Sequence, residues 1–247
     1  MTAPRIDRRQ RGVALLLTLW ALALLSLLML QIITTVRLEN RQSLHQLQQA
    51  RADLVAEAGL ALAVMHLSDP QREQRWRANG QPYAQQLGDS QLTVQVHSDM
   101  GKVDLNSSSP ELCARLARIL GASGREAGQL AAALRARQTD AEITPLRVLE
   151  EAMQLPGMSS ELFERLLPYI TVWSGYDEPA AALASAPVRD ALGQGLVANA
   201  DEVDPGPVLS VTSEAQLNSG ARATLTATFL LTLDGGTHAY RLLRWQP

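Results

Sequence analysis

The sequence of 247 residues is long enough for one sizeable domain or two small ones. Its 22 Lys and Arg residues nearly balance 25 Asp and Glu residues, and the net charge of -3 argues against a surface built mainly to bind nucleic acid. The single cysteine, Cys113, excludes an intramolecular disulfide.

The first predicted element is an apolar run from Val13 to Val36. Before Leu30 its only polar side chains are Thr18 and Ser26, and its length matches the roughly 20 residues that a membrane-spanning helix needs. A basic segment precedes the run and holds that end of the helix on the cytoplasmic side. This segment contains Arg5, Arg8, Arg9 and Arg11 against one acid, Asp7. We therefore predict a single-pass membrane protein whose chain after Val36 lies beyond the inner face.

The junction in front of the run indicates processing. A secretory signal peptide has a shorter apolar core with a small-x-small cleavage site behind it, and Gln31 to Asn40 contains no such site. Here the basic segment ends at Arg11-Gly12 and the hydrophobic helix starts at once with Val13. This junction resembles a type IV prepilin leader, which a membrane-embedded aspartyl peptidase cuts after the glycine. The resemblance implies cleavage between Gly12 and Val13, whereas a plain signal anchor would keep the leader.

An amphipathic helical segment is predicted to follow without a break. Apolar residues recur at steps of three and four positions, and polar residues lie elsewhere. The apolar positions are Leu47, Ala50, Leu54, Ala58, Ala61 and Met65. Because proline excludes the helical conformation from the residue before it, the helix should end ahead of Asp69-Pro70. We expect this apolar face to pack against a core.

Strands are predicted on both sides of the middle of the chain. Leu92, Val94 and Val96 alternate with polar residues and predict a strand, after a polar loop from Asp69 to Asp89. Near the C-terminus the predicted strands are Val208 to Val211, Arg222 to Leu233 and Ala239 to Trp245, with Asp234-Gly235-Gly236 as a hairpin turn. Glycines and prolines between Val172 and Pro207 predict an extended connection with about one helical turn.

Four short helices are predicted between the two groups of strands. Two capping boxes, each a serine followed three residues later by a glutamate, open the first and the second. The predicted starts are Ser108 with Pro110 and Glu111, Ser123 with Glu126, Thr144-Pro145, and Ser159 or Ser160, and the predicted ends are Leu120, Arg137, Leu155 and Leu167. The predicted fold class is α+β: a long N-terminal helix packed on a small antiparallel sheet, with an inserted all-α subdomain.

This order of parts resembles the K-type minor pseudopilin of bacterial type II secretion, general secretion pathway protein K (GspK). The motifs that carry the resemblance are Arg9 to Leu17, Gly101 to Asn106, Leu155 to Met158 with Leu166 to Val172, and Tyr240 to Trp245. It implies a pilin-like inner-membrane protein, processed by the prepilin peptidase, with its C-terminal domain in the periplasm. It also implies a position at the tip of the pseudopilus, a filament built of the major pseudopilin, beside the I- and J-type minor pseudopilins. There the protein would help to start assembly of the filament and so support secretion across the outer membrane.

The resemblance implies a division of the chain into six parts. They are a leader (1–12), a transmembrane helix (13–36), the periplasmic half of the long helix (37–68), a loop and first strand (69–104), a helical insert (105–171), and a linker with the C-terminal strands (172–247).

One residue departs from the usual pilin-like pattern in a way that has a physical consequence. Most pilin-like proteins carry a glutamate four residues beyond the new N-terminus, where its carboxylate pairs with the terminal amine of a neighbouring subunit. Leu17 stands there in this sequence. A subunit without this carboxylate cannot neutralise a buried amine, so it is better suited to be the first subunit than a later one. Val13 also stands where many relatives carry a methylated Phe or Met.

A calcium site is implied by some relatives, near the junction with the sheet. Calcium requires several converging oxygen ligands. The candidate carboxylates are Asp177, Glu178, Asp201, Glu202 and Asp204. Exposed acids in a polar loop usually face solvent, and no other cofactor is expected.

Two other classes of function fit the sequence less well. A membrane-anchored, competence-type DNA receptor would use helix-hairpin-helix turns such as Leu155-Pro156-Gly157-Met158, but Ser159 follows where such turns carry a glycine. The insert is also not basic, with eight Lys or Arg and nine Asp or Glu from Lys102 to Arg165. An enzyme is not expected, because Cys113 lies on an apolar helix face and the histidines show no metal-ligand spacing. These histidines are His45, His66, His97 and His238.

Overall fold

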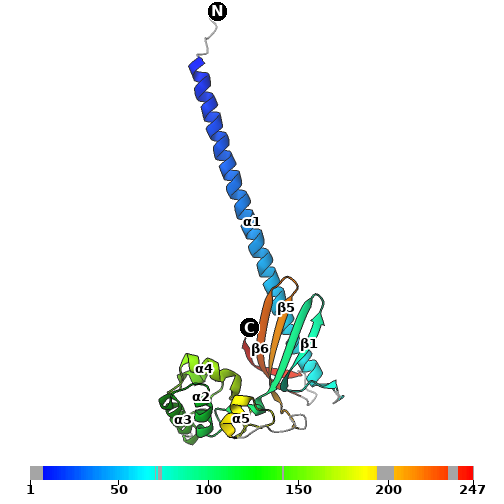
Figure 1. Cartoon of the computed structure of the whole chain (residues 1–247), viewed down its shortest axis with the longest axis vertical. Helices are drawn as coiled ribbons and strands as arrows, with labels where there is room; N and C mark the ends of the chain where they lie inside the picture. Colours follow the sequence, from blue (N-terminus) through cyan, green and yellow to red (C-terminus); the bar gives the residue numbers. More distant parts are fainter. Residues whose placement is uncertain are drawn as a thin grey trace, which may run out of the picture. The chain divides into compact units, whose positions relative to one another are not determined.

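The computed structural model of the chain describes residues 8–69, 71, 74–140, 142–193, 203–232 and 239–246. The chain divides into two compact units, Met1–Arg51 and Ala52–Pro247. Helix α1 (Arg8–Leu67) begins in the first unit and ends in the second, and its last residue confirms the end predicted from Pro70 (Figure 1). In the described part of the chain, no helix combines the length and the apolarity of a membrane span.

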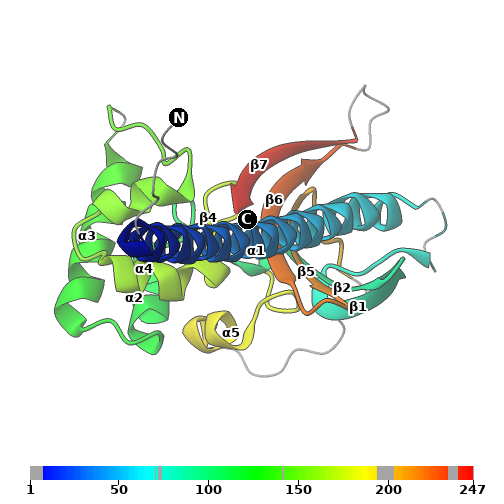
Figure 2. The same ribbon diagram turned by 90° about the horizontal axis from the view of Figure 1, so that it is seen from above.

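The second unit contains a five-stranded antiparallel sheet in the order β1-β2-β5-β6-β7. Its strands are β1 (Asn79–Leu87), β2 (Ser90–Ser98), β5 (Val208–Leu217), β6 (Arg222–Leu231) and β7 (Tyr240–Gln246). The part of α1 after Arg51 covers one face of this sheet, here called the inner face (Figure 2). Leu60 of α1 packs there with Val94, Val211 and Phe229 of the strands.

The strands confirm the prediction where apolar and polar residues alternate in the sequence. Leu225, Ala227 and Phe229 of β6 all lie on the inner face and are buried. Strand β5 runs to Leu217, six residues beyond its predicted end, because its later inward residues include Ser213 and Ala215, which give a weak hydrophobic signal. The predicted hairpin turn at 234–236 lies outside the described residues.

The predicted loop from Asp69 to Asp89 is wrong over its second half, which forms strand β1. This strand is at the edge of the sheet and most of its side chains are exposed, so no apolar alternation marks it. Its Pro82 lies where the register with β2 shifts, which is where an edge strand tolerates a residue without an N–H donor.

The predicted packing face of the long helix is also wrong. The side chains of α1 that enter the core are Ala52, Ala56, Leu60, Ala63, Val64 and Leu67. The helix approaches the sheet most closely at Gly59, where a Cβ atom would overlap Ser213 Oγ and lie 3.1 Å from Val94 Cγ2. Gly59 therefore leaves room for the strand, whereas Leu54 and Met65 point away from the sheet and are exposed.

A helical insert lies between β2 and β5 and has its own hydrophobic core (Figure 1). Leu116, Leu130, Leu134 and Leu162 are completely or almost completely buried within it. Its helices are α2 (Pro110–Ile119), α3 (Gly124–Thr139), α4 (Ser160–Leu166) and α5 (Ala186–Leu192), with the 3-10 helices η2 (Asp99–Gly101), η3 (Leu149–Gln154) and η4 (Leu167–Tyr169). The short strands β3 (Val103–Asp104) and β4 (Ile170–Thr171) pair in parallel, one just before α2 and the other just after η4.

The helix starts of the insert are confirmed in part. Ser123 and Glu126 form the complete predicted capping box, and these hydrogen bonds lower the pKa of the Glu126 carboxyl. Ser159 caps α4 as predicted. The cap of α2 is Ser109 and not Ser108, which is buried and accepts a hydrogen bond from the Asp104 N–H.

The third predicted helix does not begin at Thr144-Pro145. Only η3, from Leu149 to Gln154, forms in this segment. The Asn106 side chain holds both backbone groups of Leu146, accepting from its N–H at 2.8 Å and donating to its carbonyl at 2.9 Å. These tertiary hydrogen bonds replace the local ones that a helix would use.

Candidate functional site

An apolar stripe on α1 is the most prominent open surface of the second unit. Leu54, Ala58, Ala61 and Met65 follow one another at steps of four, three and four residues, which places them on one helix face. Leu54 is 64% exposed and Met65 is 57% exposed. Ala61 is also exposed and Ala58 is half-buried, so the larger side chains of this stripe, Leu54 and Met65, are available to another molecule.

A row of polar side chains crosses the outer face of the sheet, opposite α1. His97, Ser210, Thr228 and Arg244 are aligned across β2, β5, β6 and β7, and paired residues point to the same face. Ser210 Oγ and Thr228 Oγ1 lie 3.0 Å apart within the row. The side chain of His97 keeps contact with solvent, yet crowding by protein atoms lowers the pKa of its imidazole, and the Lys102 cation lowers it further.

Asp99 links this row to strand β4 of the insert. Its Oδ1 accepts from Lys102 Nζ and from Ser210 Oγ, each at 2.7 Å, and its Oδ2 accepts from Thr171 Oγ1 at 2.6 Å. Lys102 Nζ also donates to Ser210 Oγ at 2.6 Å. The exposed fractions of the Asp99 and Lys102 side chains are 1% and 14%, so each charge depends on the other for compensation.

The segment from Gly101 to Asn106 extends this junction into the insert. Asp104 is fully buried and its Oδ2 accepts from the Gly175 N–H at 2.8 Å. Asn106 holds Leu146 and donates to the Val172 carbonyl at 3.2 Å. A Cβ atom at Gly101 would overlap the backbone of Leu183. This segment, one of the motifs that carry the family resemblance, is thus a structural link between the sheet and the insert.

Sequence reasoning missed Asp99, Ser210, Thr228 and Arg244 as parts of this junction. Asp99 and Ser210 are 111 positions apart in the chain, and only the strand register brings them together. The one local signal was the motif from Gly101 to Asn106, whose polar residues alternate with apolar ones.

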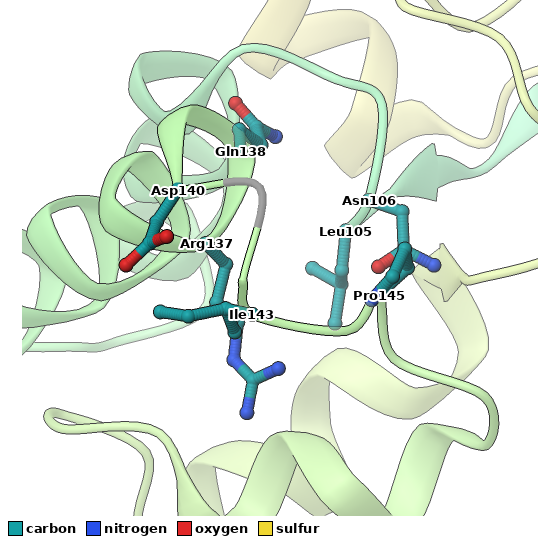
Figure 3. A pocket seen from close by; sticks show the side chains of 7 residues that line it. All are labelled: Leu105, Asn106, Arg137, Gln138, Asp140, Ile143 and Pro145. Atoms are coloured by element: carbon teal, nitrogen blue, oxygen red, sulfur yellow. The ribbon is translucent and has the colours of Figure 1, made fainter.

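A shallow cavity of about 310 Å³ opens in the insert after α3 (Figure 3). Leu105, Asn106, Arg137 and Gln138 contribute to its wall. Arg137 Nη1 donates to the Thr144 carbonyl, and Gln138 Nε2 donates to the Ser108 carbonyl, each at 2.9 Å. These donors are already used in holding the adjacent loops, so the cavity gives no argument for a ligand.

The predicted processing site lies at the start of α1. Gly12 and Val13 belong to a helix whose backbone is described from Arg8, and Leu17 is 64% exposed in the first unit. Cleavage between Gly12 and Val13, and the role of Leu17, stay predictions.

The calcium candidates are described only in part. Asp177, Glu178 and Asp204 are exposed, and Asp204 Oδ1 accepts from the Gly206 N–H at 2.9 Å. Asp201 and Glu202 lie outside the described residues. Among the residues that the structure describes, no three metal-ligating side chains come together, and calcium binding stays a prediction.

Two residues considered for chemistry are packed inside the insert. Cys113 is buried, and burial raises the pKa of its thiol to about 12. The hairpin glycine, Gly157, has a φ of 88°, and a Cβ atom there would overlap the Glu126 carbonyl oxygen and lie 2.9 Å from Leu130 N. The Met158 N–H is used within the turn by the Leu155 carbonyl, at 3.0 Å. This hairpin packs against the first turns of α3.

These elements together define a pseudopilin-like fold: a long helix, an antiparallel sheet packed on its C-terminal part, and an all-α insert between two strands. Among solved structures, a chain in the crystal structure of the GspK-GspI-GspJ complex from the enterotoxigenic Escherichia coli Type 2 Secretion System has this fold. The similarity has a TM-score of 0.57 at 15% sequence identity and covers 83% of this chain and 98% of that one. No protein-family model matches the sequence, and no curated protein matches it either.

Proposed function

We propose that this chain is a minor pseudopilin at the tip of a type II secretion pseudopilus, where it starts assembly and supports secretion across the outer membrane. The observation that carries the proposal is the likeness to a chain of the GspK-GspI-GspJ complex over 98% of that chain's length. In this proposal residues 13–36 anchor the chain in the bacterial inner membrane, and the domain that follows lies in the periplasm.

The proposed partners are the I- and J-type minor pseudopilins and the major pseudopilin. The apolar stripe of Leu54, Ala58, Ala61 and Met65 supports this choice, because exposed apolar side chains at helical spacing suit packing against another helix. Leu17 supports the tip position, since a leucine cannot compensate the terminal amine of a subunit that is already in place.

The first test is the mass and the N-terminal sequence of the membrane-bound protein, made with and without a prepilin peptidase. We expect a new terminus at Val13, with or without a methyl group, that depends on the peptidase and is lost in a Gly12→Asp variant. If Met1 to Gly12 stayed attached in every case, the pseudopilin proposal would be wrong.

A second test addresses the partners. In co-purification with I- and J-type pseudopilins, Leu54→Arg or Met65→Arg should reduce recovery of the partner, because each places a charge in the apolar stripe. Glu57→Arg is the matched control, since it introduces the same side chain at an exposed polar position of the same helix. Equal recovery with all three variants would exclude the stripe as the contact surface.

A further inference from the structure

The two edges of the sheet are protected to different degrees. At the β1 edge, the inward side chain Tyr83 is stacked on Trp76, and Trp76 is stacked on His66 of α1, with ring centroids 4.3 and 4.5 Å apart. Strand β1 also contains Pro82, which lacks a backbone donor. Strand β7, at the opposite edge (Figure 2), contains no proline.

The inner face of β7 is apolar and open. Leu242 pairs with Phe229 and Trp245 pairs with Ala227, so both side chains lie on the face that α1 covers elsewhere. They are nevertheless 43% and 40% exposed. The hydrophobic surface of the sheet therefore continues past the edge of the helix onto β7.

The outer face of β7 carries two arginines, of which one is paired within the protein and the other is open. Arg244 is held by Glu150 of the insert, with Arg244 Nε donating to Glu150 Oε1 at 2.9 Å, and its side chain is 13% exposed. Arg241, opposite Leu230, is exposed, and β7 contains no carboxylate. A segment that paired with β7 would therefore be favoured by acidic residues on the outer face and apolar residues on the inner face.

The backbone of β7 specifies the form of such a segment. Among the described strands β7 pairs only with β6, so alternate N–H and C=O groups point away from the sheet. The bulge at Leu243, between the pairs Phe229–Leu242 and Thr228–Arg244, divides the strand into two short stretches. Pairing is therefore limited to a few residues on either side of the bulge.

We propose that the edge of β7 binds an extended, acidic segment of another protein chain, which adds to the sheet as a further strand. Backbone hydrogen bonds to β7 supply the pairing, Leu242 and Trp245 receive apolar side chains on the inner face, and Arg241 pairs with a carboxylate on the outer face. This proposal does not depend on the place of the chain in a secretion filament.

Hydrogen exchange of the full-length protein in detergent tests the proposal, with a synthetic peptide of alternating Asp and Val as the probe. We expect the peptide to slow the exchange of amides in β7 and to leave those in β1 unchanged. Arg241→Glu should weaken its binding by roughly tenfold and favour a peptide of alternating Lys and Val instead.

Leu242→Ser and Leu87→Ser form a matched pair, because Leu87 is 40% exposed on β1. Only the β7 variant should weaken binding. The competing explanation is that the bulge and Arg241 protect the edge of β7 from pairing with another strand. An absence of protection at β7, equal effects of both serine variants, or a failure of the charge reversal to exchange the preferred peptide would each overturn the proposal.

Discussion

The sheet and the helical insert of the second unit depend on interactions over different distances along the chain. In the sheet, Leu92 pairs with Ala215, and the core forms only when such distant segments meet. In the insert, Ser123 and Glu126 define a helix start with their own side chains. A change in the sheet core should therefore spread across several strands, whereas a change in the insert should stay within it. The two regions contact each other at the polar junction around Asp99 and through the ion pair of Arg244 with Glu150.

The largest effect is expected for Phe229→Ala. Phe229 is completely buried and packs edge-on against Tyr240, with ring centroids 5.7 Å apart. The cavity should lower the free energy of unfolding by about 4 kcal/mol. Hydrogen exchange in the detergent-solubilised protein should accelerate in β2, β5 and β6 while α2 and α3 keep their protection. Equal acceleration in both regions would show that the two cores unfold as one.

Asp99→Ala should have the second largest effect on stability, because it weakens the link between the sheet and the insert. It leaves Lys102 without its counter-charge and removes the acceptor of Ser210 and Thr171, at a cost of about 3 kcal/mol. Exchange should accelerate first in β4 and at the start of the insert. Adding Lys102→Met should restore part of the stability, because it removes the uncompensated charge. A double variant less stable than the single one would contradict this account.

Gly157→Ala should have a moderate effect that is confined to the insert. It forces a Cβ atom onto the Glu126 carbonyl at a φ of 88°, at a cost of about 2 kcal/mol. Gly128→Ala is the control, since Gly128 lies in α3 with no atom within 4 Å of the added Cβ and should gain about 0.5 kcal/mol. The free energies of unfolding of both variants are measured by urea unfolding, monitored by tryptophan fluorescence and by circular dichroism. A Gly157 variant as stable as the native protein would show that the hairpin is not packed against α3.

The smallest effect on stability is expected from ionisation of the Cys113 thiol. Since burial raises the pKa of its thiol to about 12, the native protein should resist iodoacetamide in mildly alkaline buffer and react only on unfolding. The thiol of the unfolded chain ionises near pH 9.0, so the contribution of this residue to stability is complete below that pH and is lost as pH rises towards 12. Rapid alkylation of the folded protein would mean that the insert core opens readily.

The sequence predicted the elements that carry a local signal. The capping box at Ser123, the cap at Ser159 and the alternation in β2 and β6 are all present. Strand β1 was missed because an edge strand with both faces largely in solvent has no need of apolar alternation.

The packing face of α1 was missed because both faces of this part of the helix repeat apolar residues at helical spacing, so the periodicity does not distinguish them. The face that packs is the one with Gly59, whose lack of a side chain leaves room for Ser213. The partners of Asp99 were beyond sequence reasoning, since Ser210 and Thr171 meet it only through tertiary structure.

The contact at Gly59 also has a mechanical consequence. The helix backbone at Gly59 lies against the Ser213 side chain of β5, and Ala56 and Ala63, one turn away on either side, are buried in the same core. A displacement by about one turn, roughly 5.4 Å along the helix axis, would bring the Cβ atom of Ala56 or Ala63 close to the position of Gly59, where it would overlap the Ser213 side chain. Gly59 is therefore a steric stop: a pulling force along the last four turns of α1 must overcome this overlap with Ser213 before the helix can move along β5.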